Sequence, residues 1–306
     1  MKKSLLLLLL TFFILHASAQ QELRYAESSN SLLWEISGNN LKEPSYIFGT
    51  YHFAGRSYLD TLPVINKVFQ QAKIVVGEIS MGNEILLNAQ LEPHMKMSDN
   101  KLDKLLSASE YEMVNKYLIK ISNGLHLNMF NSKKPAAIQL LLMRYTAPVK
   151  LAEKEQLMDL YFQDQGEKLK KEIIGLESIA DQGRLLFGRP VKRQKRLLLK
   201  FVEQADKKEE QAVEMFEYYK SQDLENLEKT FSKYKDYTNK ELNSLLKNRN
   251  IQWMKKLPAI MSKGSAFIAV GGGHLLGKYG MLNLLRKAGY IVRPIETKKA
   301  IISYMP

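Results

Sequence analysis

The chain has 306 residues, of which 45% are hydrophobic and none is cysteine, and its formal net charge is +13. This composition predicts a globular fold with a sizeable core, while the lack of cysteine excludes disulfides, a lipidated cysteine and thiol catalysis. The positive charge favours attraction to anionic surfaces such as lipid headgroups or cell-envelope polymers, and no motif indicates nucleic-acid binding.

The N-terminal segment has the three parts of a secretory signal peptide. A basic start at residues 1–3 is followed by an almost entirely apolar block at residues 4–15 and by the small residues Ala17-Ser18-Ala19. A membrane anchor is the alternative, but the block is well short of the about 20 apolar residues that span a bilayer. We therefore predict a signal peptide over residues 1–19 that is cleaved after Ala19, and a secreted or periplasmic protein without a transmembrane segment in its mature chain.

A strand, a helix and a second strand are predicted next. Residues 32–37 and 45–50 are short β-rich runs around a Gly-Asn-Asn turn, which predicts a β-hairpin. Residues 59–72 carry apolar side chains at helical spacing, and residues 73–77 form a short apolar run. Because such a crossover is normally right-handed, we expect the strands at 45–50 and 73–77 to run parallel in one sheet.

The middle of the chain is predicted to be mostly helical. Helical spacing covers residues 102–125, 134–144 and 151–165, and Gly166 is the predicted C-cap of the third helix. One strand at 172–176 interrupts these helices, and residues 190–263 are again charged and helical. Within the last segment we expect ordinary helix packing, rather than a cofactor site, for the buried faces formed by Met215, Tyr218, Tyr219, Leu224, Leu227 and Phe231.

The C-terminal part repeats the order of strand, helix and strand at residues 266–270, 279–288 and 290–295. The sequence therefore predicts an α/β fold in which both termini build a mostly parallel central sheet and a large helical insertion accompanies it. We expect residues 20–306 to form a single domain with its core at about 30–80, 170–178 and 264–296 and its helical insertion at about 81–169 and 179–263.

Two short segments repeat each other across the chain. One reads Tyr-Ile-Phe-Gly-Thr-Tyr-His and ends at His52, and the other reads Ile-Ala-Val-Gly-Gly-Gly-His and ends at His274. Each is an apolar run closed by Gly-x-x-His, in a chain that has only five histidines. Glu78 and Glu177 follow two other predicted strands. Because the carboxyl ends of parallel strands share one edge of a sheet, we expect these four side chains to converge there.

Two imidazoles and one or two carboxylates suit a borderline divalent ion such as Zn²⁺, Mn²⁺ or Co²⁺. Such an ion activates water, and a carboxylate that is not a ligand can accept the proton. For Glu177 the alternative is to cap a helix that begins near Ser178. Arg249 is a candidate for gripping a substrate carboxylate or pairing with Glu78, the alternative being simple solvation. Asp159 lies on the helix predicted before the strand at 172–176 and is a further candidate for this edge, the alternative being an exposed helix position.

Two other site types are disfavoured. The glycine series at Gly271, Gly273 and Gly277 follows a strand and resembles a dinucleotide-binding loop, but the segment that ends at His52 lacks this series. The chain also lacks the Gly-x-Ser-x-Gly motif that holds the nucleophile of many serine hydrolases. We therefore expect neither a nucleotide cofactor nor a serine nucleophile.

These motifs together resemble the TraB/GumN family, which includes the Tiki metalloproteases and the pheromone-shutdown proteins. The segment Phe48 to His52 resembles the first Gly-x-x-His of the family, Val76-Gly77-Glu78 its strand with an acidic residue, and Val270 to Leu275 its second Gly-x-x-His. The resemblance extends from about Leu33 to Pro294 and implies an α/β core related to the erythromycin-esterase-like group.

The resemblance also implies a chemistry. In the Tiki branch of the family it is metal-dependent peptidase activity, with manganese or cobalt as the type of cofactor. Carried over to this chain, His52 and His274 become metal ligands and Glu78 the catalytic or ligating carboxylate. Asp159, Glu177 and Arg249 resemble further positions of the family pattern.

Taken together, these features predict an exported metal-dependent hydrolase that acts on a peptide or protein substrate. We expect Glu78 and Arg249 as catalytic residues and His52, His274, Glu78 and Glu177 as metal ligands, with Mn²⁺ or Co²⁺ ahead of Zn²⁺. The alternatives are a non-catalytic envelope protein that binds a peptide or polysaccharide and an esterase.

Overall fold

A computed structural model describes residues 30–82, 84–152, 155–233 and 236–297. The signal peptide predicted at residues 1–19 lies outside this part of the chain. Within it, no helix combines the length and the apolar character that crossing a membrane requires.

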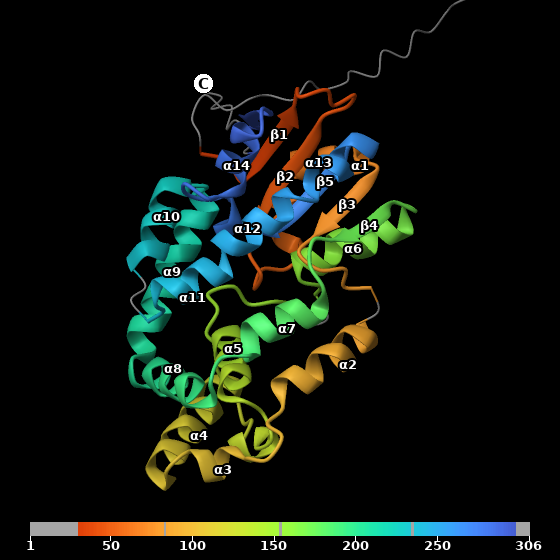
Figure 1. Cartoon of the computed structure of the whole chain (residues 1–306). Coiled ribbons are helices and arrows are strands. Elements are labelled where there is room, and N and C mark those ends of the chain that lie inside the picture. Colours follow the sequence, from red (N-terminus) through yellow and green to blue (C-terminus); the bar gives the residue numbers. More distant parts are fainter. Residues whose placement is uncertain (1–29, 83, 153–154, 234–235, 298–306) are drawn as a thin grey trace, which may run out of the picture.

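A six-stranded sheet forms the centre of the fold, with the strand order β4-β3-β5-β2-β1-β6 (Figure 1). Strands β4, β3, β5 and β2 pair in parallel, whereas β1 runs antiparallel to both of its neighbours. The predicted mostly parallel sheet and the predicted hairpin of its first two strands are therefore confirmed. The strands are β1 Leu33–Ser37, β2 Ser45–Thr50, β3 Ile74–Gly77, β4 Glu172–Gly175, β5 Ala266–Gly271 and β6 Ile291–Pro294.

The two segments that end in Gly-x-x-His belong to neighbouring strands. Every residue of β2 and β5 is buried, which explains why both read as continuous apolar runs. In their parallel register Gly49 lies opposite Val270, and Thr50 opposite Gly271. The chain therefore leaves both strands at nearly the same height of the sheet.

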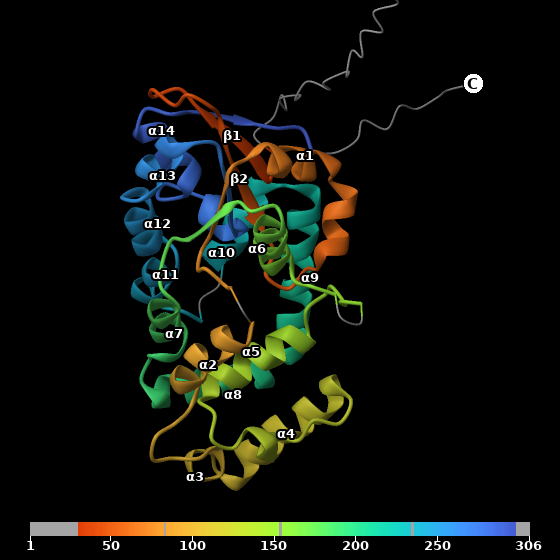
Figure 2. The ribbon, with the colours of Figure 1, turned by 90° about the vertical axis from the view of Figure 1, so that its right-hand side faces the viewer.

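Helices pack around the sheet and continue beyond its carboxyl edge. Figure 2 places α3 and α4 at the end of the molecule far from β1. A second hydrophobic cluster, separate from the core around the sheet, joins α3, α4, α5 and α8. The helices are α1 Pro63–Gln71, α2 Glu84–Met95, α3 Leu102–Leu105, α4 Ala108–Ser122, α5 Pro135–Tyr145, α6 Met158–Lys168, α7 Ile179–Phe187, α8 Val191–Glu203, α9 Ala205–Ser221, α10 Leu224–Lys233, α11 Asn239–Leu245, α12 Lys247–Met254, α13 Leu257–Lys263 and α14 Met281–Lys287.

Two predicted helices are each divided in the structure. The one expected at 59–72 is a 3-10 helix followed by α1, which begins at Pro63, where the ring favours a first helical turn. The one expected at 102–125 is divided between α3 and α4 because Ser107 and Glu110 form a capping box that starts a new helix.

The helix expected at 151–165 begins later and ends later than predicted. It is α6, which starts at Met158, and its C-cap is Leu169 rather than Gly166. A Cβ at Gly166 would lie 2.6 Å from Ile173 Cδ1 and 2.8 Å from Val75 Cγ2. This glycine therefore allows α6 to approach the sheet closely instead of ending the helix.

Candidate functional site

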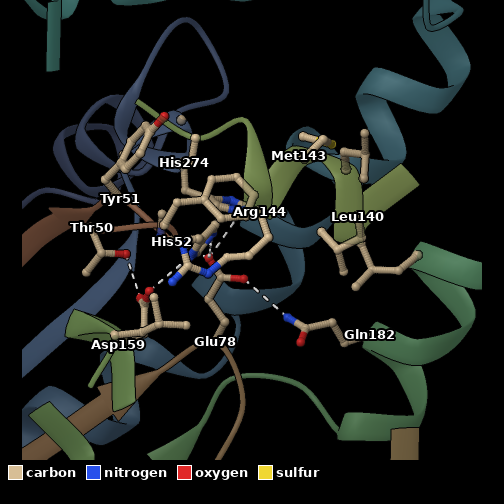
Figure 3. A pocket seen from close by; sticks show the side chains of 18 of the residues that line it. Thr50, Tyr51, His52, Glu78, Leu140, Met143, Arg144, Asp159, Gln182 and His274 are labelled. Atoms are coloured by element: carbon tan, nitrogen blue, oxygen red, sulfur yellow. Dashed lines mark hydrogen bonds and ion pairs between the residues drawn. The ribbon is translucent and has the colours of Figure 1, made fainter. Parts of the chain in front are cut away.

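Four sheet strands deliver the predicted site residues to one edge. His52 follows β2, Glu78 follows β3, Glu177 follows β4, and His274 lies in the 3-10 helix Gly272–Leu275 after β5. His52, Glu78 and His274 line a cavity of about 880 Å³ between this edge and the helices beyond it (Figure 3). Glu177 does not line the cavity.

Both imidazoles face the same carboxylate oxygen. His52 Nε2 and His274 Nε2 each lie 3.6 Å from Glu78 Oε1. The two nitrogens are therefore no farther apart than twice that distance. The convergence expected from the parallel strand ends is present, although the residues come from opposite ends of the chain.

His52 is oriented by a second carboxylate. Its Nδ1 lies 3.0 Å from Asp159 Oδ2, and Thr50 Oγ1 donates to Asp159 Oδ1 at 2.6 Å. Because a carboxylate accepts, Nδ1 carries a hydrogen and Nε2 is directed at Glu78. Burial alone would lower the pKa of His52, but the negative charges of Asp159 and Glu78 raise it to about 9. The ring faces the open cavity and is 54% exposed.

His274 is buried and oriented by an amide. Asn250 Nδ2 donates to the carbonyl oxygens of His274 and Tyr279, which directs its Oδ1 to His274 Nδ1 at 2.6 Å. Nδ1 therefore carries the hydrogen and Nε2 keeps its lone pair. Burial lowers the pKa of His274 to about 3, with a further contribution from the Arg249 charge, so the ring is neutral at neutral pH.

Arg249, on α12, connects these groups. Its Nε and Nη2 donate to the two oxygens of Glu177 at 3.0 and 2.6 Å, and Nη2 also donates to Glu78 Oε2 at 2.5 Å. Its Nη1 donates to His274 Nε2 at 2.9 Å. Of the alternatives for Arg249, pairing with Glu78 is therefore confirmed and simple solvation is wrong. The cap of α7 is Ser178, whose hydroxyl accepts from Asp181 N, rather than Glu177.

Glu78 is an anion in this setting. Burial alone would raise its pKa, but the positive charges of His52 and Arg249, together with a hydrogen bond from Gly271 N, hold it well below its usual range. Gln182 Nε2 also donates to Glu78 Oε2 at 3.3 Å. A carboxylate with this many donors is fixed in orientation.

The side chains of the site are of the types that bind a divalent metal ion, but their present arrangement is not that of a metal site. In the described part of the chain, no group of three or more His, Cys, Asp and Glu side chains is arranged to hold an ion, and Arg249 Nη1 occupies the lone pair of His274 Nε2. Each ring nevertheless has its Nδ1 held by a carboxylate or amide oxygen, as is usual for metal-ligating histidines. The residues fit a divalent ion if His274 exchanges its contact with Arg249 for that ion.

Some residues of the site were not assigned these roles from the sequence. Thr50 and Asn250 act only through contacts with Asp159 and His274, and nothing local to them signals that. The packing residues Met215, Tyr219, Leu227 and Phe231 also line the cavity, a role that helical spacing did not predict. His94 and His126, for which no role was expected, are not among the lining residues.

Replacing Gly271 by alanine is expected to displace His52 and to destabilise the fold by about 1–3 kcal/mol through overpacking. A Cβ at this position would lie 2.6 Å from His52 Nε2 and 3.3 Å from Glu78 Oε1. The displacement is measured by the NMR shifts of the His52 ring, and the stability by urea denaturation. Gly272→Ala is the matched control, because its Cβ would meet no atom closer than 3.5 Å. Equal effects of both substitutions would contradict the expectation.

A model of the TraB/PrgY/gumN family matches residues 32–294 of the chain. Metalloprotease TIKI1 of Xenopus tropicalis is 23% identical over 90% of this chain and 63% of its own length, and Metalloprotease TIKI2 of Danio rerio is 21% identical over 89% and 62%. Metalloprotease TIKI1 of Homo sapiens is 23% identical over 92% of this chain and 67% of its own length. The chain thus spans a little under two thirds of the first two relatives. No solved structure matches it.

Proposed function

This chain belongs to the TraB/PrgY/gumN family, and we propose that it is an exported metal-dependent hydrolase that cleaves peptides. The observation that carries the proposal is that two histidines, each oriented through Nδ1, direct Nε2 to the same oxygen of Glu78 at 3.6 Å. The names of the metalloprotease relatives support a peptide as the substrate.

His52 and His274 are the proposed ligands, and Mn²⁺ or Co²⁺ the proposed ion, with Zn²⁺ as the alternative. The negative charges of Asp159 and Glu78 that favour a proton on His52 would equally favour a divalent cation in its place. When bound, the ion would supply Lewis-acid activation of water and of a substrate carbonyl. Since Glu177 is paired with Arg249 and does not line the cavity, we assign it to holding Arg249 rather than to the ligand set.

Glu78 is the proposed proton carrier. It accepts a proton from the attacking water and delivers it to the leaving amine, so that a C–O bond forms as the amide C–N bond breaks. Arg249 and Gly271 N hold the carboxylate through the reaction by donating to its two oxygens. Arg249 also places a positive charge beside the reacting centre, where negative charge develops in amide hydrolysis.

A non-catalytic binding protein is the second candidate. It is favoured by the contact of Arg249 Nη1 with His274 Nε2, which satisfies that nitrogen without an ion. In this case the cavity would hold a peptide or polysaccharide without turnover.

Metal content tests the proposal against this candidate. The purified mature protein dialysed against Mn²⁺ or Co²⁺ is expected to retain one ion per chain, and the His52→Ala/His274→Ala double variant none. The matched control is His94→Ala/His126→Ala, which removes two histidines that do not line the cavity and leaves the ion in place. Elemental analysis that finds no ion in the parent protein, or an equal amount in the His52→Ala/His274→Ala variant, would reject the metal site. Cleavage of a peptide library, compared with ester substrates, then separates a peptidase from an esterase.

A further inference from the structure

The cavity extends from the catalytic edge into a layer of apolar helix faces. It is lined by Leu140 and Met143 of α5, Leu197 and Phe201 of α8, Met215 of α9 and Phe231 of α10. Its volume of about 880 Å³ lies in the range of sites that bury most of a small ligand. This part of the cavity therefore suits an apolar chain that reaches the edge at one end.

The cavity also contains a cation that has no charged partner among the described residues. Lys208 pairs with Asp236, and Arg249 with Glu78 and Glu177. Arg144, by contrast, has no hydrogen bond or ion pair with any residue in the described part of the chain. Figure 3 shows its side chain extending from α5 toward the edge that carries His52 and Glu78. It is half-buried.

The helix dipole explains only part of this arrangement. Arg144 lies in the last turn of α5, where a cation is favourable. That effect does not depend on which side of the helix the cation occupies, whereas Arg144 is among the residues that line the cavity. A guanidinium that loses water without gaining a partner is costly. An anionic group of a ligand would remove that cost.

We propose that Arg144 anchors the C-terminal carboxylate of a short apolar peptide, so that the peptide bond to be cleaved lies at His52, Glu78 and His274. A guanidinium binds a carboxylate through two parallel hydrogen bonds. The C-terminal carboxylate is the one anion that every apolar peptide carries, and the apolar lining receives its side chains. Arg144 is thus a specificity-determining residue, and this inference rests on the proposed peptidase function.

Binding is measured by fluorescence anisotropy with an N-terminally labelled pentapeptide of leucine and alanine, as the free acid and as the C-terminal amide. The full mature chain with Mn²⁺ is used in the Glu78→Gln background, where turnover does not consume the probe. The acid is expected to bind at least about 10-fold more tightly than the amide, as for hydrogen bonds to charged groups. Arg144→Gln is expected to abolish this preference by weakening the acid alone.

Two further variants show whether the effect of Arg144→Gln on binding comes from loss of the anchor, from loss of folding or from the change in net charge. Arg196→Gln, at an exposed arginine of α8 that does not line the cavity, makes the same charge change and is expected to keep the preference. Arg144→Lys keeps a cation at the end of α5 and is expected to retain part of the preference. Circular dichroism shows whether Arg144→Gln folds. If it does not, Arg144→Lys is the test instead, and an undiminished preference for the acid in Arg144→Lys would overturn the two-bond anchor.

The outcomes also distinguish this inference from the proposed function. Equal binding of acid and amide, or a preference that survives in Arg144→Gln, overturns the anchor even if the parent cleaves peptides. An Arg144-dependent preference without cleavage by the parent leaves the anchor standing and rejects the peptidase. Dodecanoate is the comparison probe, and Arg144-dependent binding of dodecanoate without binding of the peptide overturns the choice of a peptide.

Discussion

Replacing Arg249 by methionine is expected to lower the free energy of unfolding by about 3–5 kcal/mol, the usual cost of removing one partner from a buried ion pair. The side chain of Arg249 is only 13% exposed and donates to both Glu78 and Glu177, which are 9% and 13% exposed. Methionine keeps much of the packing volume but removes the cation that pairs with Glu177 and leaves Glu78 to pair with His52. Urea denaturation followed by circular dichroism measures the change.

Two controls show whether the cost is electrostatic. Lys116→Met removes one exposed charge that pairs with Glu112 at 3.5 Å, and it is expected to cost less than about 1 kcal/mol. Arg249→Met/Glu177→Gln also removes the buried charge of Glu177 and is expected to recover part of the loss. An Arg249→Met variant within about 1 kcal/mol of the parent would mean that the carboxylates do not depend on this cation.

Replacing Glu78 by glutamine is expected to lower kcat by a factor of about 10²–10⁴ on any peptide that the parent cleaves, since general acid–base catalysis contributes that much. Glutamine has nearly the shape of glutamate and can still accept from Gly271 N, so the imidazoles keep their positions. What it loses is the ability to take a proton from water. Steady-state kinetics with saturating Mn²⁺ measures the rate, and elemental analysis shows whether the ion is still bound.

Glu35→Gln is the control for this substitution. Glu35 of β1 is also a buried carboxylate paired with an arginine, Arg293 of β6 at 3.2 Å, but it does not line the cavity. We expect this variant to lose stability without losing kcat. A Glu78→Gln enzyme with kcat within about 3-fold of the parent would show that Glu78 is not the proton carrier.

The sequence alone predicted the frame that positions the site. The strands that end at Thr50 and Gly271 are buried on both faces of the sheet, and such strands are recognised in a sequence as continuous apolar runs. The Gly-x-x-His repeat then placed His52 and His274 at one edge, because parallel strands end on the same side. Burial and position at a strand end can be predicted from the sequence because both depend on the strand to which the residue belongs.

Helix ends were less predictable from local signals. Gly166 has the sequence position of a C-cap, yet it lies within α6, where its lack of a side chain allows close contact with Ile173 and Val75. A glycine near the end of a helical pattern can either end the helix or allow close packing, and only the position of the neighbouring strands shows which of the two applies.

The tertiary structure alone decided which polar groups meet. Arg249 binds Glu177 and Glu78 across 72 and 171 residues of sequence, and Asp159 orients His52 across 107. Periodicity reports whether a side chain is buried, but the partner of a charge depends on how distant elements pack. The sequence thus determined the sheet and the edge where two histidines converge. The contacts of Arg249 with both carboxylates and the place of Arg144 in the cavity follow from helix packing, because contacts form between neighbours in space.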